Sequence, residues 1–588
     1  MAERTRAESV AHDDEGALAL LGKKQVLKRR FGFASLFGFA VCELITWETV
    51  LAIFSQAFNN GGPAGAVYGF IIAWSSTLSV YTVISELASL APIAGGQYYW
   101  VYMLAPANYK TALSYVVGWL TSLAWIATVA TETLFAGTII QGILILDYSP
   151  EYSPKPYQGT LLTWLVICVC IFINVIIPNW LPRFEIGMVV FHIIGFIAIV
   201  ATLWALTPHY STSSDVWALA LNNGGWPTQG LSYCVGFLGN VATFVGADAS
   251  VHLAEEVSNA ALNIPRAILA AMTINGAVGF IMMVTVLYCL GDITTVEDTA
   301  TGYPFIQIFK DSVSSTAGAT VMSAVVLILT WACATGILTT ASRMVWSFAR
   351  DNGLPASRQL SRVNSRTKIP VTAVLTVAVI SALLTLIYIG SDAAFNDVIS
   401  LTITGFYGSY FIPASLLLYR RIKGQILPYG TTPEPAHTRG MSTFNFEKPA
   451  TGADSPSRSE EADKVKIERE GKGADSPSAA AHADIGHGSV LNEAPLIWGP
   501  WHLKGIFGII NNAYACVYMI FVIFWSVWPP DYKVTAATMN YSVAVTGGVM
   551  LLSFIWYMVR AKKLYKGPTV DEEVVAAVLR HGSVVSVS

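Results

Sequence analysis

Charged residues are scarce in this chain. Asp, Glu, Lys and Arg make up 12% of its 588 residues, whereas 54% are hydrophobic. A soluble protein of this length would carry about twice that charged fraction, so the composition excludes an ordinary soluble globular domain. The net charge of −3 lacks the basic excess of proteins that bind nucleic acid, and we expect no nucleic-acid partner.

Motifs of common enzymes are missing as well. The chain has no Walker loop, which excludes an ATP-driven pump of that type, and no GxSxG, HExxH or GxGxxG motif in its expected context. We therefore predict no enzyme activity, no catalytic residues and no cofactor. The cysteines lie inside apolar runs, lack the spacing of zinc ligands or a disulfide framework, and are interpreted as packing residues, so no metal site is expected: Cys42, Cys168, Cys170, Cys234, Cys289, Cys333 and Cys516.

What the chain does contain is long apolar runs separated by short polar gaps. A membrane helix needs about 20 apolar residues to cross about 30 Å of hydrocarbon, and lipid cannot satisfy exposed backbone groups. The runs therefore predict an all-α integral membrane protein with about twelve transmembrane helices, surrounded by membrane lipid. The first run is too long for a cleaved secretory signal. The predicted spans are 35–56, 65–91, 113–145, 159–178, 183–206, 230–250, 266–290, 318–347, 370–390, 395–419, 505–528 and 540–560.

Basic residues gather in alternate connections between these spans. Six lie between spans eight and nine, from Arg343 to Lys368, and five lie in the C-terminal tail, from Arg560 to Arg580. Because cytoplasmic loops carry an excess of Lys and Arg, both chain ends are predicted to be cytoplasmic. The plasma membrane is favoured, with a vacuolar or other organelle membrane as the alternative. The predicted tails are 1–31 and 561–588.

One polar stretch interrupts the pattern between spans ten and eleven. Residues 423–494 are rich in Glu, Ser, Lys, Gly and Pro, and such a segment cannot bury enough apolar surface to fold. We predict a disordered cytoplasmic insertion over 421–497, followed by spans eleven and twelve within 498–560. The sequence GADSPS occurs twice in it and makes Ser455 and Ser476 candidate sites for regulatory kinases. A featureless solvated linker is the alternative interpretation.

The string ELASLAPIAGGQYYW, from Glu86 to Trp100, ends the second span. Pro92, Gly95 and Gly96 break a helix and allow close approach of backbones, and the aromatic residues that follow suit a membrane interface. The whole string resembles the amino acid–polyamine–organocation (APC) permease superfamily. It is most similar to the amino acid/choline branch, which includes fungal GABA permeases and choline transporters.

The resemblance continues through roughly residues 32–425 and 495–570, although the long insertion departs from the family's usual short loop. It implies a LeuT-like core over 32–420, made of two inverted five-helix repeats (about 32–206 and 229–420), plus two extra helices. It also implies a substrate site near the bilayer midplane, beside interrupted spans one and six. Four further stretches carry it: GWLTSLAW (118–125), GADASVHLAEEVSNAALNIPRAI (246–268), SRMVWSFARDNGLP (342–355) and WGPWHLKGIFGIINNAYA (498–515).

Span one supplies the first candidate substrate-binding residues: Thr46, Trp47, Glu48 and Thr49. A carboxylate inside a membrane costs about 2.5–3.5 kcal/mol on insertion scales and usually faces a cavity or a partner. We hypothesise that Glu48 meets the cationic end of the substrate or carries a coupling proton, and that Trp47 adds a cation–π face. A glutamate paired inside the bundle for structure is the alternative. No glycine lies within 46–49 to favour an unwound helix there.

Other ionisable residues also lie inside the predicted spans. Glu43 precedes Glu48 by five residues, which places them about 140° apart on a continuous helix, so they are not expected to form an acid/base pair. Glu132 and His192 are also intramembrane. A lone histidine in such a place is interpreted as a hydrogen-bonded packing residue rather than a ligand.

Span six supplies the second group of candidates, Thr243, Phe244 and Gly246. A helix broken near Gly246 would expose backbone N–H groups that can bind a substrate carboxylate, because a helix terminus carries unpaired donors and a positive dipole end. Phe244 would close over the bound substrate.

The residues that follow are candidates for gating and coupling. By resemblance, Asp248 matches an acidic position of the family that helps gating. His252, Glu255 and Glu256 lie toward the cytoplasmic end, where they are expected to form a gate network with Arg266 or with the arginines of span eight. Plain solvation at the membrane interface is the alternative for this cluster.

Together these observations predict a secondary active transporter, a permease, that moves a small amino acid or amine such as GABA or choline by alternating access. Proton coupling is implied by the resemblance, with sodium as the alternative ion. From another class, a non-transporting nutrient sensor with a transporter fold would signal through the cytoplasmic insertion. Uptake in reconstituted vesicles separates the two.

Overall fold

The computed structural model describes residues 21–293, 299–390, 393–431, 496–536 and 538–569, together with residues 14, 16, 18, 19 and 296. Most of the predicted insertion, with Ser455 and Ser476, lies outside the described residues, as do parts of both predicted tails.

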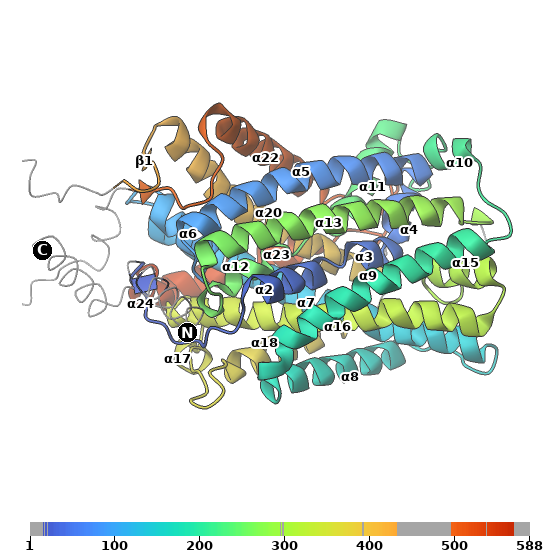
Figure 1. The fold of residues 1–588 in the computed structure, drawn as a ribbon, viewed down its shortest axis with the longest axis horizontal. Coiled ribbons are helices and arrows are strands. Elements are labelled where there is room, and N and C mark those ends of the chain that lie inside the picture. Colours follow the sequence, from blue (N-terminus) through green and yellow to red (C-terminus); the bar gives the residue numbers. More distant parts are fainter. Residues whose placement is uncertain are drawn as a thin grey trace, which may run out of the picture.

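Long helices lie side by side along one direction and form a single bundle (Figure 1). Eleven helical segments of the described chain are long and apolar enough to cross a membrane. Span six is divided into short pieces, so it falls outside that length criterion, and adding it gives the predicted twelve. The predicted all-α membrane fold is therefore confirmed.

The first ten spans comprise the following elements. Spans one to five are as follows: span one is α2 (Phe33–Leu44), α3 (Thr46–Ala52) and α4 (Phe54–Asn59); span two is α5 (Gly62–Leu90), followed by α6 (Gln97–Leu104); span three is α7 (Lys110–Tyr148); span four is α8 (Pro156–Val175), followed by η1 (Pro178–Trp180); span five is α9 (Leu181–Leu206), followed by α10 (Ser213–Trp217).

Spans six to ten are as follows: span six is α11 (Gln229–Ala242), α12 (Ala249–His252) and η2 (Ala254–Glu256); span seven is α13 (Ala260–Tyr288), followed by α15 (Pro304–Val313); span eight is α16 (Thr316–Arg350), followed by α17 (Ser357–Leu360); span nine is α18 (Val371–Leu384) and α19 (Ile387–Gly390); span ten is α20 (Ala393–Ile422).

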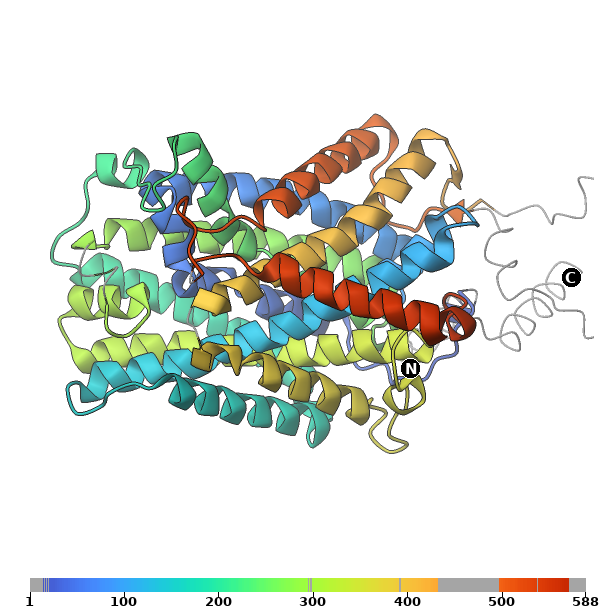
Figure 2. The same cartoon turned by 180° about the vertical axis from the view of Figure 1, so that it is seen from behind.

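The last two spans follow a small β-sheet. The strands are β1 (Ile426–Leu427) and β2 (Leu496–Ile497), span eleven is α22 (Gly505–Trp525), and span twelve is α23 (Ser542–Trp556) with η4 (Tyr557–Ala561) and α24 (Lys562–Leu564). Helices α22 and α23, drawn in orange to red, lie along one flank of the bundle (Figure 2).

Helices at matching places in the two halves pack against each other. Spans two and seven, α5 and α13, form one of the most extensive helix pairs, and spans three and eight, α7 and α16, form another. This pairing is the arrangement expected of two five-helix repeats related by a twofold axis. The two extra helices, α22 and α23, pack mainly on α20 and α5.

Apolar side chains cover the flanks of the bundle as well as its core. Ile194 and Ile197 on α9, and Leu551 and Leu552 on α23, expose half or more of their surface. Such surface is costly in water but favourable in hydrocarbon, since the backbone groups in the middle of these helices are paired within the helix. The polar groups of the site therefore lie inside, on the central helices.

The described chain ends lie at the same end of the bundle. Lys23 Nζ donates a hydrogen bond to Thr569 Oγ1 at 3.2 Å, so the first and last described segments touch. Nearby, β1 and β2 pair in parallel, with Ile426 opposite Leu496. The two ends of the insertion therefore leave the bundle at one point.

Candidate functional site

Span one is interrupted at Ile45, between α2 and α3. Ile45 has φ 28° and ψ 50°, a left-handed conformation that is unfavourable for a β-branched residue. Asn275 of α13 holds this break together: its Oδ1 accepts from the backbone N–H of Thr46, and its Nδ2 donates to the carbonyl of Val41, both at 3.4 Å. A strained residue of this kind persists only where its surroundings fix it, and it is concentrated at functional sites.

Span six is interrupted over residues 243–248, directly beside the break in span one. Gly246 has φ 111°, which favours glycine, and a Cβ there would lie 3.5 Å from the backbone oxygen of Glu43. The hydroxyl of Tyr81 on α5 accepts from the N–H groups of Gly246 and Ala247 and donates to the carbonyl of Phe244, at 3.1–3.2 Å. One side chain of span two thus satisfies three backbone groups that the broken helix leaves unpaired.

A small cavity of about 40 Å³ lies where the two breaks meet the central helices. Spans one, three, six, eight and ten all contribute to its wall. Its lining comprises Glu43, Leu44, Thr49, Ile53, Thr128, Thr131, Glu132, Phe135, Ala242, Val245, Ile337, Ile399, Thr402 and Ile403. We call it the central cavity.

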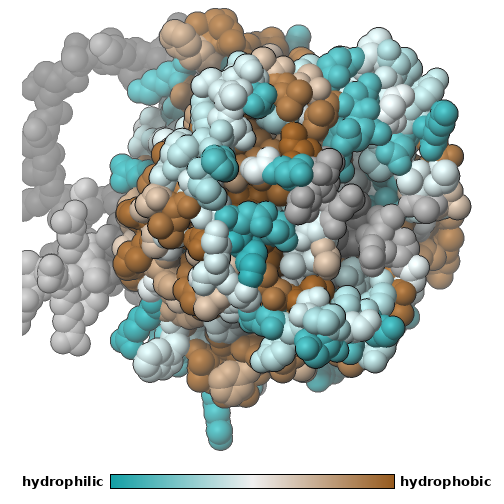
Figure 3. Space-filling view, turned by 90° about the vertical axis from the view of Figure 1, so that its right-hand side faces the viewer, coloured by the Kyte–Doolittle hydropathy of each residue, from teal (hydrophilic) through white to brown (hydrophobic). Residues whose placement is uncertain are grey.

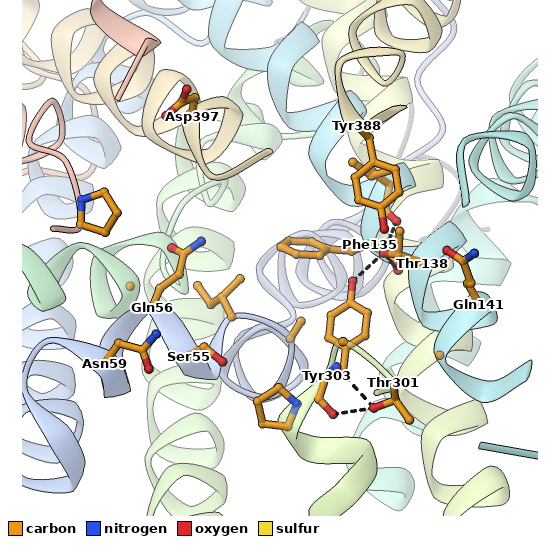
Figure 4. A pocket seen from close by; sticks show the side chains of 18 of the residues that line it. Ser55, Gln56, Asn59, Phe135, Thr138, Gln141, Thr301, Tyr303, Tyr388 and Asp397 are labelled. Atoms are coloured by element: carbon orange, nitrogen blue, oxygen red, sulfur yellow. Dashed lines mark hydrogen bonds between the residues drawn. The ribbon is translucent and has the colours of Figure 1, made fainter. Parts of the chain in front are cut away.

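A much larger open cavity, of about 520 Å³, leads to the central cavity from the end of the bundle opposite the described chain ends. We call it the vestibule; Asn59, Thr301 and Trp528 are among its lining residues. Figure 4 shows Tyr303 and Thr138 hydrogen-bonded across one wall, with Gln56 on the opposite side. Figure 3 looks onto this end of the molecule, where hydrophilic side chains gather between apolar ones. Ile53 and Phe135 line both cavities and separate them.

The opposite side of the breaks is closed by buried ion pairs. Glu255 accepts two hydrogen bonds from the Arg350 guanidinium, at 2.7 and 3.0 Å, and Glu256 accepts one from Arg343 Nε at 2.8 Å. Of the expected network, Glu255 and Glu256 pair with the arginines of span eight, whereas His252 contacts neither arginine and Arg266 is exposed. We call these two ion pairs the inner pairs.

Asp248 is the centre of a second buried network. It accepts from Gln97 Nε2 at 2.7 Å and from the hydroxyl of Tyr410, and His252 Nε2 lies 3.6 Å from it. His252 Nδ1 in turn lies 2.9 Å from the carbonyl oxygen of Ala94. These contacts join span six to the start of α6, to Ala94 before it and to span ten.

A buried ion pair next to the inner pairs ties both chain ends to span eight. Asp351, 1% exposed, faces Lys23, 4% exposed, with Nζ and Oδ1 2.5 Å apart. Asp351 also accepts from the Tyr98 hydroxyl and from the backbone and side chain of Thr569. Burial raises the pKa of the Asp351 carboxyl, but the charges of Lys23 and Arg350 outweigh burial, so this pKa lies below its ordinary value. Burial lowers the pKa of Lys23 despite the attraction of Asp351.

Comparison with known proteins supplies the family. A family model described as amino acid permease matches residues 31–446, more than two thirds of the chain. The chain belongs to the amino acid permease family. The resemblance to the APC superfamily inferred from the motifs is thereby confirmed, and the protein is a membrane transporter by family.

Named relatives of this permease are transporters as well. A protein of Macrophomina phaseolina whose name assigns it to amino acid or polyamine transport is 31% identical over 66% of this chain and 85% of its own length. The choline transporter of Saccharomyces cerevisiae is 29% identical over 70% and 72%, and its GABA-specific permease 25% over 95% and 86%. Among solved structures, the nucleobase-cation symporter MHP1 matches 69% of the chain and 83% of its own, at 14% identity and a TM-score of 0.44.

The predicted substrate residues of span one are divided between two places in the permease. Thr49 lines the central cavity. Trp47 and Glu48 instead face α9: Glu48 Oε1 lies 2.7 Å from His192 Nδ1, and the Trp47 ring lies 5.7 Å from the His192 ring. Thr46 is buried against α13, where a Cβ at Gly279 would lie 2.7 Å from its methyl group. The glutamate is thus paired inside the bundle, and a direct contact with substrate stays a prediction.

The predicted residues of span six lie within the break itself. Thr243 Oγ1 donates to the carbonyl of Asn240, and the Phe244 ring packs 4.9 Å from the ring of Phe70. Both side chains are buried and neither lines the central cavity or the vestibule. The N–H groups at and after Gly246, expected to receive a carboxylate, are occupied by Tyr81 in this arrangement.

One expectation about the ELASLAPIAGGQYYW motif is wrong. Its aromatic residues Tyr98, Tyr99 and Trp100 were expected at the membrane interface, but each is at most 2% exposed. The hydroxyls of the two tyrosines bond to Asp351 and to the carbonyl of Leu21, and the Trp100 indole donates to the carbonyl of Ala91. The motif packs the inner end of the bundle instead of anchoring it in lipid.

Sequence reasoning missed three parts of the site. Glu43 and Glu132 were noted as intramembrane but not assigned to the site, although both line the central cavity. Tyr81 and Asn275 carry no local signal, because their partners are more than 160 residues away in the chain. Only polarity inside an apolar run could have singled them out.

Proposed function

We propose that this permease is a proton-coupled secondary transporter that carries a small amino acid or amine by alternating access. One observation carries the proposal: an open vestibule extends from one end toward the breaks in spans one and six as far as Ile53 and Phe135, while ion pairs close the other end. Such asymmetry about a central site is what one state of an alternating-access carrier requires.

The proposed orientation places the vestibule outside the cell. The chain ends, the inner pairs and the insertion would then be cytoplasmic, in agreement with the basic residues between spans eight and nine. We propose the plasma membrane as the location. Ser455 and Ser476 would then be accessible to cytoplasmic kinases.

Glu48 and His192 are the proposed proton-coupling pair. Both side chains are fully buried, and their contact joins span one to span five. Neither Glu48 Oε2 nor His192 Nε2 has another partner among the described residues. Binding or loss of a proton by this histidine–carboxylate pair would change its charge and therefore how strongly the two spans attract each other.

The proposed substrate carries a cationic nitrogen. The names of relatives refer to GABA, choline and polyamines, all of which contain one. Thr49 would contact the substrate directly in the central cavity. Thr46, Trp47, Thr243, Phe244 and Gly246 would shape the two breaks around it, and Asp248, His252, Glu255 and Glu256 would gate the inner side.

Uptake into proteoliposomes of the purified full chain tests the function. Labelled GABA, choline and arginine are offered under an inward proton gradient, a sodium gradient or no gradient. We expect proton-driven accumulation of at least one of them, abolished by a protonophore. Accumulation that needs sodium and ignores the proton gradient would contradict proton coupling, and no uptake of any amine at any pH would contradict transport.

Glu48→Gln tests the coupling pair. This variant should lose proton-driven accumulation while it still exchanges external for internal substrate, because exchange needs no net proton movement. Glu185→Gln is the matched control: Glu185 is a fully buried carboxyl on α9, the helix of His192, and should retain proton-driven accumulation. Normal accumulation by Glu48→Gln would exclude this pair as the coupling site.

A further inference from the structure

The central cavity is lined by two acidic side chains and by no basic one of the described chain. Glu43 and Glu132 are its ionisable lining residues, and no Lys, Arg or His of the described chain reaches it. Both lie deep in membrane spans, Glu43 at the end of α2 and Glu132 in the middle of α7. Carboxylates at such depth are expensive unless a partner or a ligand compensates their charge.

Glu43 is the more constrained of the two. Its side chain is 2% exposed, and neither of its carboxylate oxygens has a hydrogen-bond partner among the described residues. The carboxylate fits only because position 336 is glycine, where a Cβ would lie 1.8 Å from Glu43 Oε1. A buried, unpaired carboxylate on the wall of a cavity, with space kept for it by a neighbouring helix, points to a ligand that donates hydrogen bonds.

We propose that the central cavity binds the primary ammonium group of the transported substrate, held between Glu43 and Glu132. This inference rests on the proposed transport function and names the chemical class its site selects. An ammonium group has three N–H donors and a positive charge, whereas an ionised carboxylate only accepts. The bound cation would satisfy Glu43 and offset the repulsion between the two carboxylates. The hydroxyls of Thr131 and Thr402, which also lack partners among the described residues, supply further acceptors.

The size and lining of the cavity favour a primary over a quaternary ammonium group. A volume of about 40 Å³ holds roughly three water molecules. So small a space favours an NH₃⁺ group over the larger trimethylammonium group. Quaternary ammonium groups are bound by aromatic cages, and Phe135 is the only aromatic residue in this lining. The rest of the substrate would extend past Ile53 and Phe135 into the vestibule, which borders the cavity at these two residues.

Direct binding to the purified full chain tests the site without relying on transport. The probes are two matched pairs, ethanolamine with choline and GABA with its N-trimethyl derivative, measured by isothermal calorimetry in detergent. For the wild type we expect at least tenfold tighter binding of the primary amine in one or both pairs. Glu43→Gln and Glu132→Gln should each weaken that binding at least tenfold. Glu185→Gln is the comparison variant, since Glu185 is also buried but lies outside the cavity lining; it should change the affinity by less than either cavity variant does.

The outcomes separate this inference from the proposed function. Uptake that is unaffected by both cavity variants, or equal or tighter binding of the trimethylated probes, overturns the ammonium site and leaves transport standing. Binding that depends on Glu43 and Glu132, without any uptake, supports the site and contradicts transport. If the two variants abolish a sodium requirement and spare amine affinity, the cavity is a sodium site and the inference is wrong.

Discussion

Asp351→Asn is expected to destabilise the permease strongly, because Asp351 neutralises a buried lysine. Its carboxylate receives four hydrogen bonds, from Lys23, Tyr98 and the backbone and side chain of Thr569. Removing one partner of a buried ion pair costs about 3–5 kcal/mol, since the other charge stays buried and unpaired. We therefore expect the free energy of unfolding, measured by SDS titration in mixed micelles, to fall by at least about 3 kcal/mol.

The pH dependence of that loss follows from the two lowered pKa values. Asp351 has a pKa below its ordinary value in the folded state, so its contribution is present above the ordinary pKa and disappears as the pH falls through the lowered one. The pKa of Lys23 is also lowered, so the unfolded chain binds more protons between the lowered value and 10.5, and stability rises with pH across that window. The loss caused by Asp351→Asn should therefore shrink at high pH, where Lys23 becomes neutral.

A double-mutant cycle provides the refutation. Lys23→Met combined with Asp351→Asn removes both charges and should be at least about 2 kcal/mol more stable than the sum of the single losses predicts. Asp311→Asn is the control, because Asp311 is exposed and its hydrogen bond comes from Gln307, four residues away; it should change stability by less than about 0.5 kcal/mol. A loss below about 1 kcal/mol in Asp351→Asn, or additive single losses, would show that the pair behaves as a surface ion pair.

Two further substitutions test the site. Gly336→Ala places a Cβ against the Glu43 carboxylate and should reduce both the affinity for amines and the free energy of unfolding, the latter by about 1–3 kcal/mol. Gly548→Ala on α23 is the control, because its Cβ meets open space and should change neither quantity. Calorimetry measures the affinity and SDS titration the stability of the two variants. Tyr81→Phe removes the hydroxyl that bonds to the N–H groups of Gly246 and Ala247 and to the carbonyl of Phe244. The free energy of unfolding should fall by at least about 2 kcal/mol and most of the uptake should be lost. Unchanged uptake would mean that the broken helix needs no support from span two.

The spans could be predicted from sequence because hydropathy and length alone decide them. Predicted span five, 183–206, agrees with α9 within a few residues, and Glu255 and Glu256 pair with the span-eight arginines, one of the two sets of partners that the sequence left open. Both results depend on composition and on charges placed at helix ends. Neither requires knowledge of how distant helices approach each other.

The interior of the site could not be predicted in the same way. Span one lacks glycine near 46–49, yet its helix breaks at Ile45, where Asn275 of span seven stabilises the freed backbone groups. The break divides Glu43 from Glu48, so one carboxylate lines the central cavity and the other pairs with His192. A helical wheel drawn for a continuous helix contains no information about such a break, which is fixed by contacts between residues far apart in the chain.

The short parallel sheet of β1 and β2 makes the length of the insertion irrelevant to the membrane bundle. Since Leu427 and Ile497 lie on adjacent strands, the chain departs from the helices and rejoins them at one place, whatever number of residues intervenes. A fluorescent protein or an affinity tag fused between residues 432 and 495 would thus be attached beyond the β1–β2 pair and would leave the positions of spans ten and eleven unchanged. Because parallel strands need a connecting segment of about a dozen residues or more, the insertion could be shortened to about that length but not to a tight turn.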